Sequence, residues 1–323
     1  MGEEMKILVF GAGVIGTVYA WQLSKANQDV TLLVRPGRKQ EIESKGIFIS
    51  CLDKRGEMKR IETVYHPRLV EDFSPSEGYE LILVCVKRNQ LKDVLPLLAE
   101  KAGNTDILFL QNNWSGTAEI EQHLAPACFV LGFPSIGGGR DEHGIQCVLG
   151  AETMLGEKDG QITPRLQNIA GILREAGFKP KITRQIVPWL LTHYAEIAAL
   201  VGALYKAGSF TMLANDSALL KEALLAAREG LAVCRARGIN PMSLSNIRLI
   251  YLPMFLVVPF TKRAYKSEEA RLVFEGHVAH ANDEMQVIYH EVLADGERLS
   301  VKMPYFQGFK EYVEQSITAI GVS

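Results

Sequence analysis

A glycine-rich turn near the start of the chain most strongly constrains its fold. Residues 6–10, Lys-Ile-Leu-Val-Phe, form a short apolar run typical of a buried strand. The sequence Gly-Ala-Gly-Val-Ile-Gly follows directly at residues 11–16, and apolar residues then recur at helical spacing from Val14 to Lys25. A strand, a G-x-G-x-x-G turn and a helix in this order predict the first βαβ unit of a dinucleotide-binding fold.

Each glycine of the turn has its own task in such a fold. Gly11 permits the tight turn, Gly13 lets a pyrophosphate approach the backbone, and Gly16 lets the helix pack closely on the strand. The diphosphate then lies on the helix N-terminus, where free N–H groups and the helix dipole favour an anion. We therefore expect Gly11, Gly13, Val14, Ile15 and Gly16 to bind the cofactor. The alternative is a structural turn with fortuitous spacing.

The end of the second predicted strand, Asp29 to Val34, indicates which dinucleotide is bound. An NAD site usually carries a carboxylate there, which hydrogen-bonds the ribose 2′-hydroxyl. This chain has Arg35, Arg38 and Lys39 instead, and no acid. A 2′-phosphate is matched by such cations, and arginine can bind it bidentately. The sequence predicts NADP(H), with Arg35 and Arg38 as phosphate ligands; a solvated basic loop is the alternative.

The rest of the first half continues the alternation of strands and helices. Further strands are predicted at residues 80–86, 106–111 and 128–132, with helical patterns around 90–101 and 116–123. This order is typical of an α/β fold, a doubly wound parallel sheet covered by helices on both faces.

Beyond residue 133 the pattern is less regular. We expect a flexible turn at Gly137–Gly139, an antiparallel pair formed by residues 145–149 and 152–156, a helix over 163–177 and a short strand at 179–183. Long helical patterns then dominate, at residues 187–206, 216–237 and 265–294 and from about residue 304. The chain is therefore predicted to hold a Rossmann domain at residues 1–184 and an all-helical substrate or dimerisation domain at 185–323.

Composition limits the classes of partner. The formal net charge is −2, so no bulk field favours nucleic acid or a membrane surface. The apolar run from Leu249 to Phe260 is interrupted by prolines and is shorter than the roughly 20 residues of a membrane helix. With no signal peptide and five scattered cysteines, we expect a cytoplasmic protein with reduced thiols. A homodimer is compatible with the helical domain.

In the order of its motifs the chain resembles the ketopantoate reductase (2-dehydropantoate 2-reductase) family. After the basic loop comes Val-Lys-Arg-Asn-Gln at residues 86–90, similar to the family's Lys-x-x-Gln. Residues 110–116, Leu-Gln-Asn-Asn-Trp-Ser-Gly, are similar to its Gln-Asn-Gly-x-Gly. The resemblance implies hydride transfer from NADPH to a 2-keto acid in a cleft between two domains, a step of pantothenate biosynthesis.

The same resemblance implies roles for individual residues. Lys87 and Gln90 would lie near the cofactor and substrate, and Asn112 would hold the nicotinamide side of the site. The alternatives are a solvated lysine at a strand end and an ordinary turn residue.

The chain departs from the family where the catalytic lysine is expected, shortly after a tryptophan on the first long helix of the second domain. If Trp189 is that tryptophan, Leu191 takes the position of the lysine, and Ala195 that of a supporting asparagine. A further asparagine is missing near Ala199. None of these side chains can stabilise a developing alkoxide.

Two other residues are candidates for the missing chemistry. His193 would reach the lysine's place after a small register shift and could act as an acid near neutral pH, although a lone histidine on an apolar helix is more often a core residue. Glu284 matches the family's substrate-holding glutamate by its spacing to Pro304. The family's serine turn would fall near residues 272–274, which carry no hydroxyl.

Three explanations follow: a reductase with another substrate and proton donor, an NADP(H)-binding sensor or regulator without turnover, or a lysine such as Lys181 or Lys206 reaching the site from elsewhere. Oxidation of a hydroxy or amino acid on a similar scaffold is a further alternative. The histidines and acids around Glu284 (His277, His280, Asp283 and His290) lack an H-E-x-x-H order, so we expect no metal site. The function favoured is NADPH-dependent reduction of a 2-keto acid.

Overall fold

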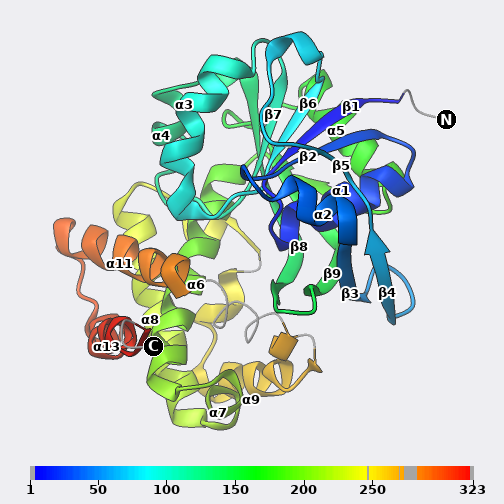
Figure 1. The fold of residues 1–323 in the computed structure, drawn as a ribbon. Helices are drawn as coiled ribbons and strands as arrows, with labels where there is room; N and C mark the ends of the chain where they lie inside the picture. The colour runs from blue at the N-terminus through cyan, green and yellow to red at the C-terminus, as the bar shows by residue number, and fades with distance from the viewer. Residues whose placement is uncertain (1–3, 246, 269, 273–281, 321–323) are drawn as a thin grey trace. The chain divides into compact units, whose positions relative to one another are not determined.

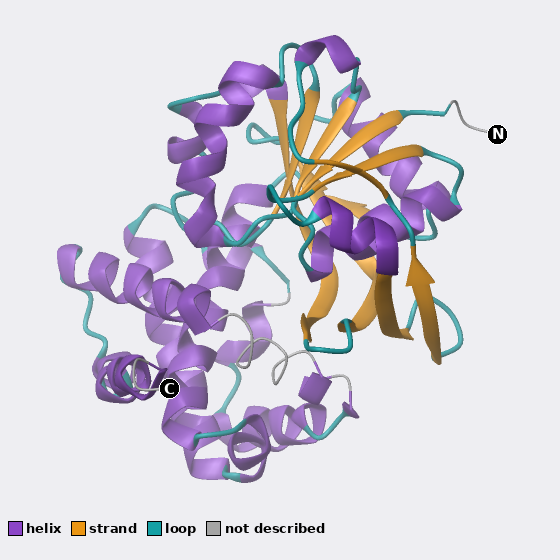
Figure 2. Cartoon of the chain, viewed as in Figure 1, coloured by secondary structure: helices purple, strands orange, loops and turns teal. Residues whose placement is uncertain are grey.

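The computed structural model describes residues 4–245, 247–268, 270–272 and 282–320 (Figure 1). The chain forms two compact units, Met1–Val187 and Pro188–Ser323. The strands in the described residues all belong to the first unit, and the second is built from helices (Figure 2). The predicted fold class, an α/β sheet followed by a helical region, is confirmed.

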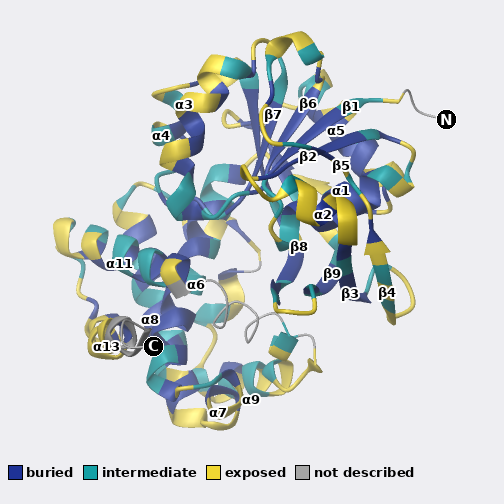
Figure 3. Cartoon of the chain, in the orientation of Figure 1, coloured by how far each residue is buried: buried dark blue, intermediate teal, exposed yellow. Residues whose placement is uncertain are grey.

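The first unit is built on one ten-stranded sheet in the order β4-β3-β9-β8-β7-β6-β1-β2-β5, with β10 paired to β9. Its strands are β1 (Lys6–Phe10), β2 (Asp29–Leu33), β3 (Ile47–Asp53), β4 (Lys59–Tyr65), β5 (Arg68–Val70), β6 (Leu81–Val84), β7 (Asp106–Leu110), β8 (Phe129–Arg140), β9 (Ile145–Gly156) and β10 (Lys179–Ile182). Pairing is parallel from β8 through β7, β6, β1 and β2 to β5. These strands are buried runs, as strands of a covered parallel sheet must be (Figure 3).

The helices of the first unit are α1 (Val14–Lys25), α2 (Lys39–Lys45), α3 (Leu91–Lys101), α4 (Ala118–Glu121) and α5 (Pro164–Glu175). The bounds of α1 agree with the prediction because apolar residues recur at helical spacing from Val14 to Leu23. Thr163 caps α5, since its side chain accepts a hydrogen bond from the backbone N–H of Leu166 at 3.2 Å.

The region after residue 133 differs from the prediction. Residues 145–156 form one continuous strand, β9, which pairs antiparallel with β8, so the expected pair of short strands within this segment is wrong. The three glycines at 137–139 lie inside β8 rather than in a turn. Gly138 has φ of +147°, and a Cβ there would overlap the carbonyl oxygen of Gln146 on the neighbouring strand. Glycine serves close strand pairing here.

Residues 39–70 hold elements that the sequence patterns did not reveal: α2, β3, β4 and β5. Strand β3 pairs parallel with the first half of β9 and antiparallel with β4, which extends the sheet beyond its Rossmann core. A cysteine from each strand, Cys51 and Cys147, meets in this register, and both thiols are buried.

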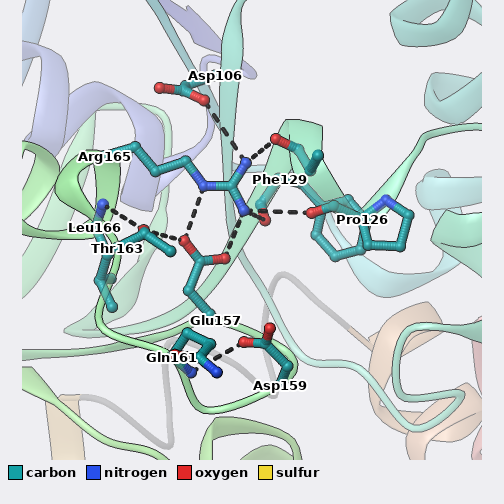
Figure 4. A network of polar contacts seen from close by, with 10 residues as sticks. Asp106, Pro126, Phe129, Glu157, Asp159, Gln161, Thr163, Arg165 and Leu166 are labelled. Atoms are coloured by element: carbon teal, nitrogen blue, oxygen red, sulfur yellow. Dashed lines mark hydrogen bonds and ion pairs between the residues drawn. The ribbon is translucent and has the colours of Figure 1, made fainter.

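A buried ion pair ties the sheet to α5 (Figure 4). The guanidinium of Arg165 donates to both carboxylate oxygens of Glu157, with Nε–Oε1 at 2.8 Å and Nη2–Oε2 at 2.6 Å. Arg165 Nη2 also donates to the Phe129 carbonyl at 3.1 Å, and the Thr163 hydroxyl donates to Glu157 Oε1. Glu157 is 3% exposed, so its charge is neutralised inside the protein by Arg165.

The helices of the second unit are α6 (Ile186–Ala207), which begins just before the unit, α7 (Phe210–Asn215), α8 (Ser217–Ala236), α9 (Met254–Tyr265), α11 (Asn282–Arg298), α12 (Pro304–Gln307) and α13 (Lys310–Ile320). Of the helix expected over 265–294, residue 269 and residues 273–281 lie outside the described residues; Tyr265 is the last residue of α9, and α11 covers Asn282–Arg298. The turn of residues 272–274 lies mostly outside the described residues.

The core of the second unit contains large aromatic residues. Tyr289 stacks on Phe306 with ring centroids 4.9 Å apart and donates its hydroxyl to the Phe306 carbonyl at 2.6 Å. Helix α6 is long and apolar enough to cross a membrane by length and composition, and 67% of its most apolar window is buried. Burial of that extent is what a core helix shows.

Candidate functional site

The glycine turn after β1 has the close packing that its motif predicts. Gly11 has φ of +114°, and a Cβ there would lie 2.7 Å from the carbonyl oxygen of Cys85. A Cβ at Gly16 would overlap the carbonyl oxygen of Gly11. Around Gly13 the position of a Cβ is open, with no described atom within 4 Å. The first and third glycines therefore hold strand and helix together, while the middle one faces free space.

That free space lies at the N-terminus of α1. Gly13 is the N-cap residue, it supplies no side-chain hydrogen bond to the helix, and the first turn of α1 contains no acid. The first amides of a helix without a side-chain cap remain available to a ligand, and the helix dipole adds partial positive charge. Val14, Ile15 and Gly16 provide these amides, so the turn can receive a diphosphate.

The basic loop after β2 is held from one side by Glu71. The Glu71 carboxylate accepts hydrogen bonds from the backbone N–H groups of Gly37 at 2.8 Å and Lys39 at 3.3 Å. Arg35 is exposed. Arg38 pairs with Glu41 on α2, with Nε–Oε2 at 3.3 Å, and about half of each side chain remains exposed. The loop thus presents two guanidinium groups to solvent on a fixed backbone.

A third cation near this loop was missed in the sequence. Burial and the positive charge of Arg38 lower the pKa of Arg140, the last residue of β8. The strand β8 was expected to end at Gly132, which is why Arg140 was not grouped with the loop. Its electrostatic interactions with Arg38 and Glu41 place Arg140 near the loop.

The segment after β6 forms a short 3₁₀ turn at Arg88–Gln90. Gln90 closes this turn, because its Oε1 accepts the backbone N–H of Lys87 at 3.1 Å. Arg88, largely buried, forms an ion pair with Glu119 at 2.9 Å. Gln90 therefore orders the loop that carries Lys87.

The segment after β7 presents amide groups. Gln111 is 5% exposed, and neither its Oε1 nor its Nε2 has a hydrogen-bond partner within the described part of the chain. Asn112 follows it and is half-buried, whereas the Asn113 amide donates to the Gly116 carbonyl. A buried amide without partners indicates a site for a ligand that offers both a donor and an acceptor.

The glycine turn, the segment after β6 and the segment after β7 lie together at the end of the sheet where the carboxyl ends of these strands meet. Strands β1, β6 and β7 are parallel neighbours, so the glycine turn, Lys87 and Gln111–Asn112 all follow their carboxyl ends. The strand order reverses between β1 and β6, and ligands of open α/β sheets bind in the crevice outside such a point. The structure thus brings the predicted cofactor residues of the first unit to a common edge.

In the second unit, His193 lies on α6. Its ring stacks on that of Trp189, with centroids 5.1 Å apart and an interplanar angle of 12°. Burial lowers the pKa of His193 to about 4. At neutral pH this imidazole is uncharged, so it can donate a hydrogen bond through N–H but carries no extra proton for a substrate.

The residues at the expected lysine and asparagine positions face the core of the second unit. Leu191 is 3% exposed, and its carbonyl oxygen accepts the thiol of Cys234 on α8 at 3.5 Å. Ala195 and Ala199 are fully buried. This face of α6 packs against α8, so it offers no open position for a polar catalytic group.

A half-buried acid on α6, Glu196, was missed in the sequence. Its Oε1 is buried and has no hydrogen-bond partner among the described residues, and burial raises the pKa of its carboxyl to about 8. One carboxylate on an otherwise apolar helical stretch was the available signal. Glu284, the predicted substrate-holding residue, lies in the first turn of α11 and is 9% exposed.

Among the described residues, no group of three or more His, Cys, Asp or Glu side chains could hold a metal ion. His277 and His280, which were considered in the sequence, lie outside the described residues.

The family model and the curated relatives that match this chain point to the same family. A family model described as ketopantoate reductase PanE/ApbA matches residues 7–159. The 2-dehydropantoate 2-reductase of Halobacterium salinarum is 23% identical over 245 residues, which span 73% of this chain and 77% of that protein. The Bacillus subtilis enzyme of the same name is 32% identical over 127 residues, 39% of each chain.

Solved structures share the fold over the whole chain. A 2-dehydropantoate 2-reductase from Geobacter metallireducens has a TM-score of 0.70 at 20% identity, covering 96% of this chain and 99% of that one. D-mandelate dehydrogenase in a ternary structure with NADH and anilino(oxo)acetate has a TM-score of 0.75 at 17% identity, covering 99% and 100%.

Proposed function

Because the chain belongs to the ketopantoate reductase family, we propose that it is an NADP(H)-dependent reductase of a 2-keto acid. The family and its relatives establish an oxidoreductase with a nicotinamide cofactor; the preference for NADP(H) and the substrate are our proposal. The observation that carries it is the open N-terminus of α1 next to a loop with two exposed arginines and no acid.

The residues present fit such a cofactor. The open space around Gly13 and the amides of Val14, Ile15 and Gly16 would receive the diphosphate. Arg35 and Arg38 would hold the 2′-phosphate. Lys87, Gln90, Gln111 and Asn112 would serve the nicotinamide side, and Gln90 also orders the loop of Lys87. When bound, the nicotinamide supplies the hydride.

Reduction of a carbonyl leaves negative charge on its oxygen, and the enzyme must stabilise that charge or supply a proton. We assign this task to His193, acting as a neutral N–H donor, because its ring orientation is fixed by the stack with Trp189. Glu284 is assigned to binding a hydroxyl of the substrate. With Leu191 buried in the core, neither residue is helped by a lysine at that position.

The test is NADPH oxidation by the purified protein with a panel of 2-keto acids that includes ketopantoate, together with the Kd values for NADPH and NADH. Turnover with at least one keto acid and a lower Kd for NADPH support the proposal. Turnover with NADH alone contradicts the cofactor assignment.

A second candidate is a regulatory protein that binds NADP(H) without turnover. It is favoured by the burial of Leu191 and Ala195 where the family's catalytic side chains would lie. Tight NADPH binding with no oxidation across the panel is its expected result.

A further inference from the structure

The second unit contains a cavity of about 240 Å³ that the proposed reduction does not use. Its walls come from α6, α8, α9 and the 3₁₀ turn at Ile247–Tyr251. Most of the lining is hydrocarbon, and the polar side chains among its residues are Glu196, Thr261 and Tyr265. The cavity is therefore apolar with one ionisable carboxyl in its wall.

The carboxyl of Glu196 is the unusual part of this wall. Its Oε1 is buried without a hydrogen-bond partner in the described residues, although leaving a buried polar atom unpaired costs about 1–3 kcal/mol. Other buried acids of this protein have partners: Glu157 has Arg165, for example. A buried carboxylate oxygen kept without a partner beside a cavity indicates a ligand that completes its hydrogen bonds.

The charges around the cavity narrow the class of ligand. None of its described lining residues is lysine or arginine. Glu196 interacts electrostatically with Tyr265 and with Cys234, and neither of these two groups is a cation. A carboxylate ligand would find no cation in this wall to offset its own charge. A protonated amine would supply the missing positive charge and donate directly to Oε1.

We propose that this cavity binds a small primary amine with a compact hydrocarbon body, whose ammonium group pairs with Glu196. An apolar cavity of roughly 150 Å³ is enough to bind benzene, so the cavity of about 240 Å³ has room for a small aromatic ring with a short amine arm. The hydrocarbon body packs on Ile197, Leu200 and Leu224, which line the walls. None of the lining residues is among the proposed cofactor residues, and the inference does not rest on the proposed reduction.

The test uses three molecules of nearly equal shape: benzylamine, benzyl alcohol and benzoate. Isothermal titration calorimetry on the full-length protein gives the Kd of each. We expect benzylamine to bind at least tenfold more tightly than benzyl alcohol, and benzoate to bind most weakly, since a charge-assisted hydrogen bond is stronger than a neutral one.

Two variants identify the site. Glu196→Gln keeps the shape of the side chain, and we expect it to lose the tenfold preference for the amine while benzyl alcohol binds as before. Ala227→Leu adds bulk to the wall, and we expect it to weaken both ligands. Glu311→Gln, an exposed acid of α13, is the matched control and should bind like the wild type.

Equal affinities of the wild type for amine and alcohol would overturn the proposal, as would an unchanged amine affinity in Glu196→Gln. Failure of all three molecules to bind would also overturn it. Thermal unfolding of each variant shows whether the helical unit is folded. NADPH titration of the same samples reports the proposed function separately, so loss of one activity is distinguished from loss of the other.

Discussion

Ala195 on α6 packs directly on Gly230 of α8: a Cβ at Gly230 would lie 3.2 Å from the Cβ of Ala195. This contact fixes which face of α6 points into the helical core. Leu191, one turn earlier, lies on the same face and contacts Cys234 through its carbonyl oxygen. Introducing the family's lysine and asparagine at these positions would therefore place polar groups in a packed core.

We accordingly expect Leu191→Lys to destabilise the protein without creating activity. Burying an unpaired ammonium group in this position should lower the free energy of unfolding by about 2–4 kcal/mol, measured by urea denaturation. Leu191→Met, which keeps the volume and remains apolar, is the control and should cost less than about 1.5 kcal/mol. A stable Leu191→Lys protein with faster NADPH oxidation would show that this face of α6 reaches the substrate.

The glycine turn yields a pair of contrasting substitutions. Gly16→Ala should lower the free energy of unfolding by about 1–3 kcal/mol, because its Cβ would overlap the carbonyl oxygen of Gly11. Gly13→Ala meets no described atom, so the fold should tolerate it, but its methyl group would occupy the space of the diphosphate. We expect its Kd for NADPH to rise at least tenfold with an unchanged unfolding midpoint. A Gly13→Ala protein that is less stable but binds NADPH with unchanged Kd would show that the diphosphate does not bind at this turn.

The basic loop should discriminate between the two dinucleotides. We expect Arg35→Ala and Arg38→Ala each to raise the Kd for NADPH by about tenfold or more, since each removes a charged hydrogen bond to the 2′-phosphate. The Kd for NADH should change by less than about twofold. Lys45→Ala, at the far end of α2, is the control. Equal losses for both cofactors would mean that the loop does not contact the 2′-phosphate.

Stability should decrease as the pH rises because of Glu196. Burial raises the pKa of this carboxyl to about 8, above its usual value near 4.5, so the folded protein retains a proton that the unfolded chain releases. The resulting stability is fully present below about pH 4.5 and is lost as the pH rises through 8. We expect the unfolding free energy, measured between pH 5 and 9, to depend less on pH in Glu196→Gln, by on the order of 4 kcal/mol. Parallel profiles for the two proteins would contradict an unpaired carboxyl.

We expect the ion pair of Arg165 and Glu157 to contribute to the free energy of unfolding of the first unit. Arg165→Leu leaves a carboxylate that is 3% exposed without its cation, and we expect a loss of about 3–5 kcal/mol in urea denaturation. Arg174→Leu, an exposed residue of the same helix α5, should change stability by less than about 0.5 kcal/mol. Replacing Glu157 by leucine in the Arg165→Leu protein should recover part of the loss; no recovery would mean that the arginine acts through its other contacts.

The sequence predicted the elements that have strong local signals. Helix α1 and strand β1 were predicted with their observed bounds because a buried strand, the glycine turn and a helix with regularly recurring apolar residues follow each other. Helix α2 was missed because Ile42 is its only buried residue, and β3 and β4 depend on pairing with a distant strand. The glycines at 137–139 looked like a turn because the close approach of β9 cannot be read from local sequence.

Within the candidate site, the turn and the loop were predictable because their chemistry lies in contiguous residues. Gln111 and Glu196 were not, because what marks them is the absence of a hydrogen-bond partner in the folded structure. His193 was chosen for an ordinary pKa near neutrality, which burial lowers to about 4.

The pairing of β3 with β9 has a consequence for synthesis of the chain. Residues 49–53 emerge from the ribosome long before residues 145–149, yet the two segments are neighbours in the sheet. Until β9 arrives, the nascent chain exposes β3 with one edge unpaired, and contacts of such long sequence separation form slowly. The arginine loop leads through α2 directly into β3, so its downstream anchor is set only after nearly half of the protein has been made.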